Sequence, residues 1–499
     1  MMVSVVALLA KNQAGLSWSR AAAMINYVLS LHISANQKRH WKVFMKKTAK
    51  MLHLFLERGR PADAKVWSCR WDRCIKIAVP FGLLVCFFVS LRVGSWGYFW
   101  QLFQTRTYTA NLFGLVAAYT LLMLLFQGVR TVLWATYRPY APLADDLPNL
   151  TVIIPAYNEG AMVEHSLYSV ARADYPHEKL EIICIDDGST DDTWDYIAKA
   201  AGKYPHLIKT IRFPKNRGKK EGLYAGFCQG QGEVFVTVDS DSVIEKEALR
   251  HLVAPLQHDL TIGAVAGNVR VYNRHASLMG KMQWVRYVNL DFLRAAQSTY
   301  KTVTCTPGSL SAYRARALLP YLEAWRHQTF LGAPCVHSED RALTNLVLRH
   351  GWYTYYQRTA RVYTVVPETY RGVVNMYLRW ERGNVRESFV QLGYLFRRYR
   401  RKNRLITIIE FFLTQLELPM LILAFGFFLT SVWLYPPVFF KMMAFLGLMS
   451  LLGLVYYLYL ERDLEFVYGI IYSYYAFFLF QWIYPYAFFT VRDRRWLTR

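Results

Sequence analysis

The chain has 499 residues, of which 54% are hydrophobic and 16% aromatic, and its 59 Lys and Arg against 35 Asp and Glu give a formal net charge of +24. A basic, aromatic and apolar composition suggests nucleic acid or a membrane as a partner. The apolar residues gather in separate blocks along the chain. This distribution excludes a wholly soluble chain and predicts a membrane protein with a globular insert.

The apolar blocks form two groups on either side of a more polar middle. Residues 75–91 and 111–127 are each about the length that crosses a bilayer core. Three further blocks cover residues 405–434, 436–460 and 464–491. Pro485 interrupts the last block, which is too short for two helical spans of about 20 residues each. We therefore expect a broken or re-entrant segment there.

Basic residues flank the predicted spans. Residues 38–73 contain KRHWKVFMKK, RGR and RWDR, and residues 397–404 read RRYRRKNR. The positive-inside rule places both segments, and the polar middle with them, on the cytoplasmic side. A nucleic-acid role would need this charge on one face of the soluble part, so no nucleic acid is expected as a partner. We expect a multi-pass protein of the plasma or inner cell membrane, in contact with its lipids.

The N-terminus and the cysteines suggest no processing or metal signal. MMVSVVALLAKNQAG has no basic residues before its apolar run, so it is not a convincing signal peptide. Residues 40–56 fit either a basic amphipathic helix on the membrane surface or an ordinary cytosolic helix. The seven cysteines have no paired metal-type spacing, and a cytoplasmic setting argues against disulfides.

The polar middle of the chain alternates strand and helix patterns. NLTVIIPAYNE, LEIICIDDGST, LIKTIRF and GEVFVTVDSDS are typical of buried strands, and apolar residues with helical spacing follow the first two. The alternation predicts an α/β domain with a parallel sheet covered on both faces and ligands beyond the carboxyl ends of its strands. Polar clusters follow three of these strands: Asn158 with Glu159, Asp186 with Asp187, and Asp239 with Asp241.

The pair Asp239 and Asp241 carries the first chemical prediction. Side chains alternate along a strand, so both carboxylates should leave on the same side and repel unless a cation lies between them. Mg²⁺ or Mn²⁺ bridging them to a pyrophosphate would supply that cation, and Lys219 and Lys220 could meet the phosphate charge. Taken alone, the same residues are typical of a polar strand exit and a solvated loop. A nucleoside-diphosphate donor accounts for the acids, metal and lysines together.

Over about residues 110–499 the chain resembles the processive family-2 glycosyltransferases of membranes, which include chitin, cellulose and poly-N-acetylglucosamine synthases, and most closely the hyaluronan synthases. The resemblance lies in AYNE, IDDGSTDDT, RGKKEGLYAGF, VDSDSVIEKEAL, AAQSTYKTVTCTPGSLSAYR, FLGAPCVHSEDRALTNLVLRHG and VVPETYRGVVNMYLRWERGNVRESF, in this order. RWLTR at the C-terminus is similar to the family's W-G-T-R gating motif.

The resemblance implies a GT-A-type α/β domain, with a mostly parallel sheet, inserted between transmembrane helices. Its expected division is a basic and possibly interfacial N-terminal region at 1–72, two transmembrane helices at 73–140, a cytosolic catalytic domain at 141–400, and a C-terminal transmembrane region at 401–499. Residues 275–298 and 371–396 would form interfacial helices that join the domain to the membrane.

For the donor, the resemblance implies a UDP-sugar. Asp186 and Asp187 would hold its uridine and ribose, and Lys219 would face the same pocket. Asp239 and Asp241 would bind the diphosphate through Mg²⁺ or Mn²⁺, with Asp241 as the direct metal ligand. The AYNE motif would add substrate-binding residues at Ala156, Tyr157 and Glu159.

For the acceptor, the resemblance implies that Asp340 is the general base of an inverting transfer, supported by Glu339. Taken alone, Glu339 and Asp340 are typical of a helix start, where acids are favourable, and both interpretations can hold together. Arg379 would contact the pyrophosphate and Trp380 would stack under the acceptor sugar. Without the resemblance, both are ordinary residues of an amphipathic interfacial helix.

The remaining expectations concern the acceptor path and the exit. The Gly-rich acceptor loop would place Cys305, Gly308 and Ser309 near the acceptor, with Cys335 nearby; a free cysteine alone is more often a small buried apolar group. Trp496 and Arg499, with Thr498, would act as a gate. Met376 stands where the family has Gln, and Leu497 stands where it has Gly.

The predicted function is processive synthesis and secretion of a polysaccharide from UDP-sugars through the enzyme's own channel, with hyaluronan as the leading product. The donors would be UDP-N-acetylglucosamine and UDP-glucuronic acid, and the acceptor is the growing polysaccharide. Alternatives are a chitin-like or poly-N-acetylglucosamine homopolymer, a single sugar transfer to a lipid, and a non-enzymatic membrane subunit.

Overall fold

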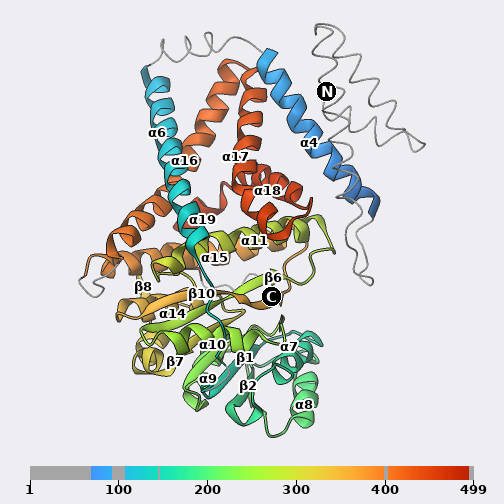
Figure 1. Ribbon diagram of the computed structural model, residues 1–499, viewed down its shortest axis with the longest axis vertical. Helices are drawn as coiled ribbons and strands as arrows, with labels where there is room; N and C mark the ends of the chain where they lie inside the picture. The colour runs from blue at the N-terminus through green and yellow to red at the C-terminus, as the bar shows by residue number, and fades with distance from the viewer. Residues whose placement is uncertain (1–68, 93–106, 144–145, 398–402, 494–499) are drawn as a thin grey trace. The chain divides into compact units, whose positions relative to one another are not determined.

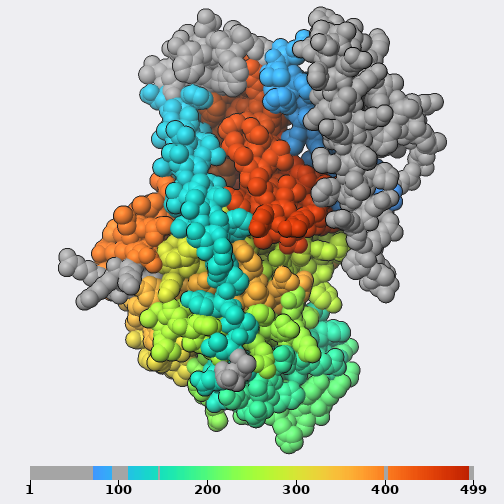
Figure 2. All heavy atoms as spheres, in the orientation of Figure 1, coloured from blue at the N-terminus to red at the C-terminus, as the bar shows by residue number. Residues whose placement is uncertain are grey.

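The computed structural model describes residues 69–92, 107–143, 146–397 and 403–493. Four helices in these ranges are long and apolar enough to cross a membrane: α4 (Cys69–Arg92), α6 (Thr107–Thr136), α16 (Arg404–Leu434) and α17 (Val438–Glu461). They coincide with four of the predicted apolar blocks. Many of their apolar side chains are exposed, and Figure 2 shows α6 at the surface along its length.

The last apolar block is broken, as its length predicts. It forms α18 (Phe466–Leu479) and α19 (Ile483–Phe489), which are bent by 50° relative to each other and together are long and apolar enough to cross a membrane. The break falls at residues 480–482, before Pro485, which lies in the first turn of α19. A proline is tolerated there because the first backbone N–H groups of a helix have no partner inside the helix. The predicted interruption is therefore present, but it precedes the proline.

The central domain is built on an eight-stranded sheet with the order β3-β2-β1-β4-β7-β6-β10-β5. Its strands are β1 (Leu150–Ala156), β2 (Leu180–Asp186), β3 (Ile208–Arg212), β4 (Val234–Thr237), β5 (Ser242–Ile244), β6 (Ile262–Val271), β7 (Ser311–Arg314) and β10 (Tyr353–Thr364). β3, β2, β1 and β4 are parallel neighbours, as predicted, and β6 is parallel to β10. β7 runs antiparallel to both β4 and β6, and β5 runs antiparallel to β10.

Alternate residues of the parallel strands fill two different cores, because successive side chains point to opposite faces of a sheet. Val152, Ile154 and Ile182 belong to one cluster, and Ile153 and Ile183 belong to the other. The helices between the strands cover the two faces: α7 (Met162–Ala171), α8 (Thr193–Lys203), α9 (Lys219–Gln229) and α10 (Ala248–His258) (Figure 1).

Shorter elements complete the domain. They are α12 (Ala315–Leu318), α13 (Leu322–Arg326) and α14 (Glu339–Arg349), two 3₁₀ turns at His177–Lys179 and Leu319–Tyr321, and a small antiparallel pair formed by β8 (Thr329–Phe330) and β9 (Ala333–Pro334). Residues 275–298 and 371–396 are helical, as predicted: they form α11 (Leu278–Thr299) and α15 (Tyr370–Leu395).

Contacts join α11 and α15 to the apolar helices. α11 packs on α6 and α18, and α15 packs on α19. Glu410 of α16 accepts hydrogen bonds from Arg130 of α6 at 3.2 Å and from Gln297 of α11 at 3.1 Å. Charged residues inside an apolar span are costly without partners, so this pairing stabilises the packing of the three helices.

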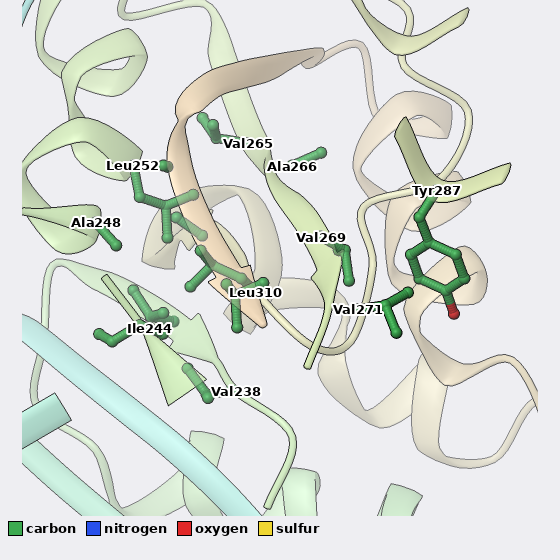
Figure 3. Packing of buried hydrophobic residues seen from close by; sticks show 14 of the residues in the cluster. Val238, Ile244, Ala248, Leu252, Val265, Ala266, Val269, Val271, Tyr287 and Leu310 are labelled. Atoms are coloured by element: carbon green, nitrogen blue, oxygen red, sulfur yellow. The ribbon is translucent and has the colours of Figure 1, made fainter. Parts of the chain in front are cut away.

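The turn between β4 and β5 contains Asp239 and Asp241 and is called the acidic turn below. Apolar residues anchor it on both sides. Val238 precedes the turn and Ile244 ends β5, and both are buried in the larger core cluster. Figure 3 shows Ile244 between Val238 and the α10 residues Ala248 and Leu252, which belong to the same cluster. Because these anchors are buried, the polar residues between them have little freedom to move.

Candidate active site

The acids after β2 hold the loop that leads into α9. Asp187 accepts hydrogen bonds from the backbone N–H groups of Arg217 at 2.7 Å and Gly218 at 2.8 Å. Gly218 has φ +94, which favours glycine. Burial raises the pKa of Asp187 above its usual value, although these two amides oppose the shift. Asp186 is fully buried beside it and accepts from the backbone N–H of Ser189 at 3.0 Å.

The AYNE segment joins the same end of the sheet. Ala156 is the buried last residue of β1, and Tyr157 and Glu159 follow it in a half-buried loop. The backbone N–H of Glu159 donates to Thr193 Oγ1 at 2.8 Å, and its carboxylate accepts from Ser240 at 2.8 Å. Since Ser240 lies between Asp239 and Asp241, Glu159 ties the loop after β1 to the acidic turn.

Asp239 and Asp241 lie in a turn between two strands and not on a strand. The strand alternation expected from the sequence therefore does not set their direction, because β4 already ends at Thr237. Asp241 accepts from Ser242 Oγ at 3.2 Å and from Thr364 Oγ1 of β10 at 3.1 Å. Burial and the nearby charge of Asp239 raise the pKa of Asp241 to about 6.

Lys219, the first residue of α9, joins the acidic turn to α14. Its Nζ lies 2.5 Å from Asp239 Oδ1 and 2.8 Å from Glu339 Oε1. Burial favours its neutral form, but the two carboxylates outweigh burial and raise the pKa of Lys219 above its usual value. Burial also opposes ionisation of Glu339, yet Lys219 lowers the pKa of Glu339. Both groups are therefore charged at neutral pH.

Asp340 follows Glu339 in the first turn of α14. Its Oδ1 accepts from the backbone N–H of Arg341 at 2.7 Å, and its Oδ2 accepts from the backbone N–H of Gly308 at 3.2 Å. Burial, together with the negative charge of Glu339, raises the pKa of Asp340 to about 6. A carboxylate with a pKa just below neutrality suits a general base, because it is ionised at pH 7 and still accepts a proton readily.

The Cys305–Ser309 segment lies against these groups. The Cys305 thiol is 3.9 Å from Asp340 Oδ2, and Ser309 is buried. A Cβ on Gly308 would lie 2.9 Å from Lys219 Nζ, so glycine allows this loop to approach the lysine closely. Burial raises the pKa of Cys305 to about 12, which argues against a reactive thiolate. Cys335 is buried and its backbone carbonyl accepts from Lys220 at 3.1 Å.

Trp380 of α15 lies in an aromatic and cationic group. Its ring centroid is 5.8 Å from that of Tyr377 and 6.5 Å from that of Tyr287. The Arg286 guanidinium of α11 lies 4.8 Å from the Tyr377 ring and 5.6 Å from the Trp380 ring. Burial raises the pKa of Glu339, whereas Lys219 and, more weakly, Arg379 lower it. Met376, at the position of the family's Gln, is buried.

The structure therefore brings together predicted residues from segments that are far apart in the chain. Lys219, Asp239 and Glu339 are in direct contact, and Asp340, Cys305 and Gly308 adjoin them. Trp496, Thr498, Arg499 and residues 40–56 lie outside the described residues.

Sequence reasoning missed several neighbours of the site. Thr344 donates to the backbone carbonyl of Asp340 at 2.8 Å and accepts from the backbone N–H of Thr306 at 2.9 Å. Its position four residues after Asp340 on a helix was an available signal. Arg286 and Thr364 have no local signal, because only the tertiary structure brings them to Trp380 and Asp241.

The acidic turn fits a divalent cation whose remaining ligands come from a substrate. No group of three or more metal-ligating side chains occurs in the part of the chain that the structure describes. Two carboxylates are nevertheless sufficient for Mg²⁺, which is commonly held by one or two carboxylates together with substrate phosphates and water. Burial and the adjacent charge of Asp239 raise the pKa of Asp241, and a bound cation would favour the ionised form that they disfavour.

Comparison with known proteins agrees with this geometry. Residues 151–321 match the family described as glycosyl transferase family 2. The chain is 29% identical to a hyaluronan synthase of Streptococcus pyogenes over 393 residues, which cover 77% of this chain and 91% of that protein. It is 34% identical to an N-acetylglucosaminyltransferase of Rhizobium meliloti over 251 residues, which cover 50% of this chain and 58% of that protein.

A solved structure shares the fold. The structure of a mannosyltransferase of Pyrobaculum calidifontis was determined in complex with GDP-mannose and Mn²⁺. It superposes on this chain with a TM-score of 0.54 at 21% sequence identity, and the superposition covers 74% of this chain and 99% of the mannosyltransferase chain. This likeness supports the GT-A-like architecture of the central sheet. The chain is therefore a glycosyltransferase with a family 2 domain and a GT-A-like fold, related in sequence to hyaluronan synthases and N-acetylglucosaminyltransferases.

Proposed function

We propose that this chain is a processive, inverting polysaccharide synthase that uses UDP-sugars, and specifically a hyaluronan synthase. The observation that carries the proposal is the double contact of Lys219, which links the donor-side carboxylate of Asp239 to Glu339, next to Asp340. The similarity to a hyaluronan synthase along 91% of that protein extends the proposal beyond the catalytic domain.

In the proposed reaction, the hydroxyl oxygen of the acceptor attacks C1 of the donor sugar. The bond between C1 and the phosphate oxygen breaks, UDP leaves, and the hydroxyl proton passes to the carboxylate of Asp340. Lys219 and Arg379 supply positive charge beside the departing diphosphate. Trp380 supports the acceptor sugar, and Asp186 and Asp187 hold the uridine side of the donor.

Asp241 and Asp239 would hold Mg²⁺ or Mn²⁺ in this site. When bound, the cation would stabilise the negative charge of the diphosphate leaving group. The protein residues then orient the donor: the turn is held by Ser242 and Thr364, and Asp239 is held by Lys219.

The proposal also assigns each domain a position relative to the membrane. The catalytic domain at 141–400 would face the cytosol, because the basic segments that flank the spans favour the cytoplasmic side. The helices at 73–140 and 401–499 would cross the cell membrane and conduct the growing chain outward, with Trp496 and Arg499 acting as the gate. The support is the four apolar helices and one bent pair found among the described residues.

The test is UDP release from membranes that contain the protein, with Mn²⁺ or Mg²⁺. UDP-N-acetylglucosamine and UDP-glucuronic acid are supplied singly and together, and Asp340→Asn is the control. We expect UDP release only when both donors are present, together with a long product. We expect this release to be lost in the Asp340→Asn control. Release of UDP from neither donor would contradict the proposal.

A second candidate is a homopolymer synthase that uses UDP-N-acetylglucosamine alone. It is favoured by the identity of 34% to an N-acetylglucosaminyltransferase. Release with UDP-N-acetylglucosamine alone, at the same rate as with both donors, would favour this candidate.

A further inference from the structure

The first turn of α14, which carries Glu339 and Asp340, begins in an unusual way. Ser338 precedes the helix with φ 54 and ψ 47, a left-handed conformation that is uncommon for a residue with a side chain. Its hydroxyl makes no capping hydrogen bond to the helix, although serine is a preferred N-cap residue. The acids of the first turn favour a helix start here, but they do not explain the left-handed conformation of Ser338, so other parts of the fold must hold this turn.

Contacts with α15 hold the first turn of α14. Gly383 packs so closely against Ser338 that a Cβ built on the glycine would lie 1.8 Å from Ser338 Oγ and 2.3 Å from Ser338 Cβ. No side chain fits at those distances. Glycine weakens a helix interior, so its presence near the middle of α15 fits a packing requirement.

Hydrogen bonds on both sides of this contact join the same two segments. Arg341, next to Asp340, donates to Asn384 Oδ1 at 2.6 Å and to Ser388 Oγ at 3.2 Å. Arg386 donates to the backbone carbonyl of His337, the residue before Ser338. Residues 337, 338 and 341 are thus each held by α15, and they bracket the two acids.

A buried carboxylate extends the contact further along both helices. Glu387 has no exposed surface and accepts from Asn345 Nδ2 of α14 at 2.9 Å and from Gln328 Nε2 at 3.0 Å. Arg386 Nε lies 2.9 Å from the same carboxylate and neutralises its charge. A fully partnered buried network of this kind makes the relative position of two helices specific.

We propose that Gly383 is a positioning residue, whose close contact with Ser338 sets the first turn of α14 and thereby the location of the Asp340 carboxylate. The inference rests on the proposed function, in which Asp340 is the general base. Gly383 lies three residues after Trp380, so the two residues are neighbours on one face of α15. The single helix α15 would then position both Trp380, which supports the acceptor sugar, and Asp340, which takes the proton of the acceptor hydroxyl.

The test compares two alanine substitutions in the same helix. Gly383→Ala forces Ser338 to move, whereas Gly393→Ala adds a Cβ that meets no atom within 4 Å. We expect Gly383→Ala to lower kcat for UDP release about 100-fold, because displacing a catalytic group by about 1 Å costs that much. The donor KM stays within about twofold of the wild-type value in both variants, since uniform donor binding is unchanged.

Rescue by a second substitution distinguishes positioning from general damage. Ser338→Gly removes both clashing atoms, leaves Ser338 Cα at 3.5 Å from the new Cβ, and accepts a φ of 54 readily. The double variant Gly383→Ala with Ser338→Gly should therefore recover most of kcat. The cycle of single and double variants measures the coupling between the two positions.

Each outcome is decisive because the wild-type protein is measured in parallel. If the wild-type protein is active and the two variants Gly383→Ala and Gly393→Ala have equal kcat, the inference is wrong. The proposed function is then unaffected. Loss of kcat without rescue, or a parallel rise in donor KM, also overturns the inference. No UDP release by wild-type protein from any donor overturns the proposed function, and the assignment of Gly383 with it.

Discussion

Lys219 Nζ lies 2.8 Å from Glu339 Oε1, and this contact joins α9, on the donor side of the site, to α14, which carries the proposed base. The two residues are 120 positions apart, and each lies at the start of its helix. The same ammonium contacts Asp239, so one positive charge is shared between two carboxylates. Removing the lysine would leave two carboxylates without their cation.

Lys219→Gln should lower kcat by about 100- to 1,000-fold, which is the usual cost of removing a group that stabilises charge in a transition state. UDP release under saturating donor measures the effect. Lys199→Gln is the matched control, because Lys199 is 65% exposed and forms a surface ion pair with Glu164. A Lys219 variant as active as the control would contradict the role.

UDP release should fall as the pH drops through about 6. The pKa of Asp340 is raised to about 6 by burial and by Glu339, and a general base works only when it is ionised. One unit below the pKa, about a tenth of the carboxylates are ionised, so kcat at pH 5 should be about a tenth of its plateau. A rate profile with constant, saturating metal and donor checks this, and an unchanged kcat from pH 7 to pH 5 would refute it.

Chelation should abolish UDP release, and Mn²⁺ or Mg²⁺ should restore it. In Asp241→Asn the metal concentration for half-maximal rate should rise at least about tenfold, because one of two anionic ligands is lost. Asp174→Asn provides the control, since Asp174 is 47% exposed and pairs with Arg250 away from the acidic turn. Equal metal dependence in both variants would exclude Asp241 as a ligand.

Trp380→Ala should shorten the polymer more than it slows the first transfers. Its half-buried ring packs on the buried rings of Tyr377 and Tyr287, which hold it in place, and a single aromatic ring offers a flat face for a sugar. Product length on a gel and initial UDP release are measured together, and Trp380→Phe should retain more length than Trp380→Ala. Trp433→Ala, at a side chain 87% exposed on α16, should leave both readouts unchanged.

Local patterns were sufficient for much of the fold. The continuous apolar runs of β1, β2 and β4 predict buried parallel strands, because both faces of such a sheet are covered. The four long apolar helices follow from their length, since about 20 residues cross a bilayer core. The acids after β2 and β4 could be predicted because ligands bind at the carboxyl ends of parallel strands.

Local sequence patterns thus predict the apolar helices, the first four strands and the chemistry available at the ends of those strands. The antiparallel insertion of β7 and the hydrogen bond from Thr364 to Asp241, which are 123 residues apart, follow from tertiary packing alone. Tertiary packing also decided the contact of Gly383 with Ser338, which no helix pattern indicates. Propensity and periodicity report on neighbours in the chain, whereas these contacts depend on how distant segments pack and which buried charges they must neutralise.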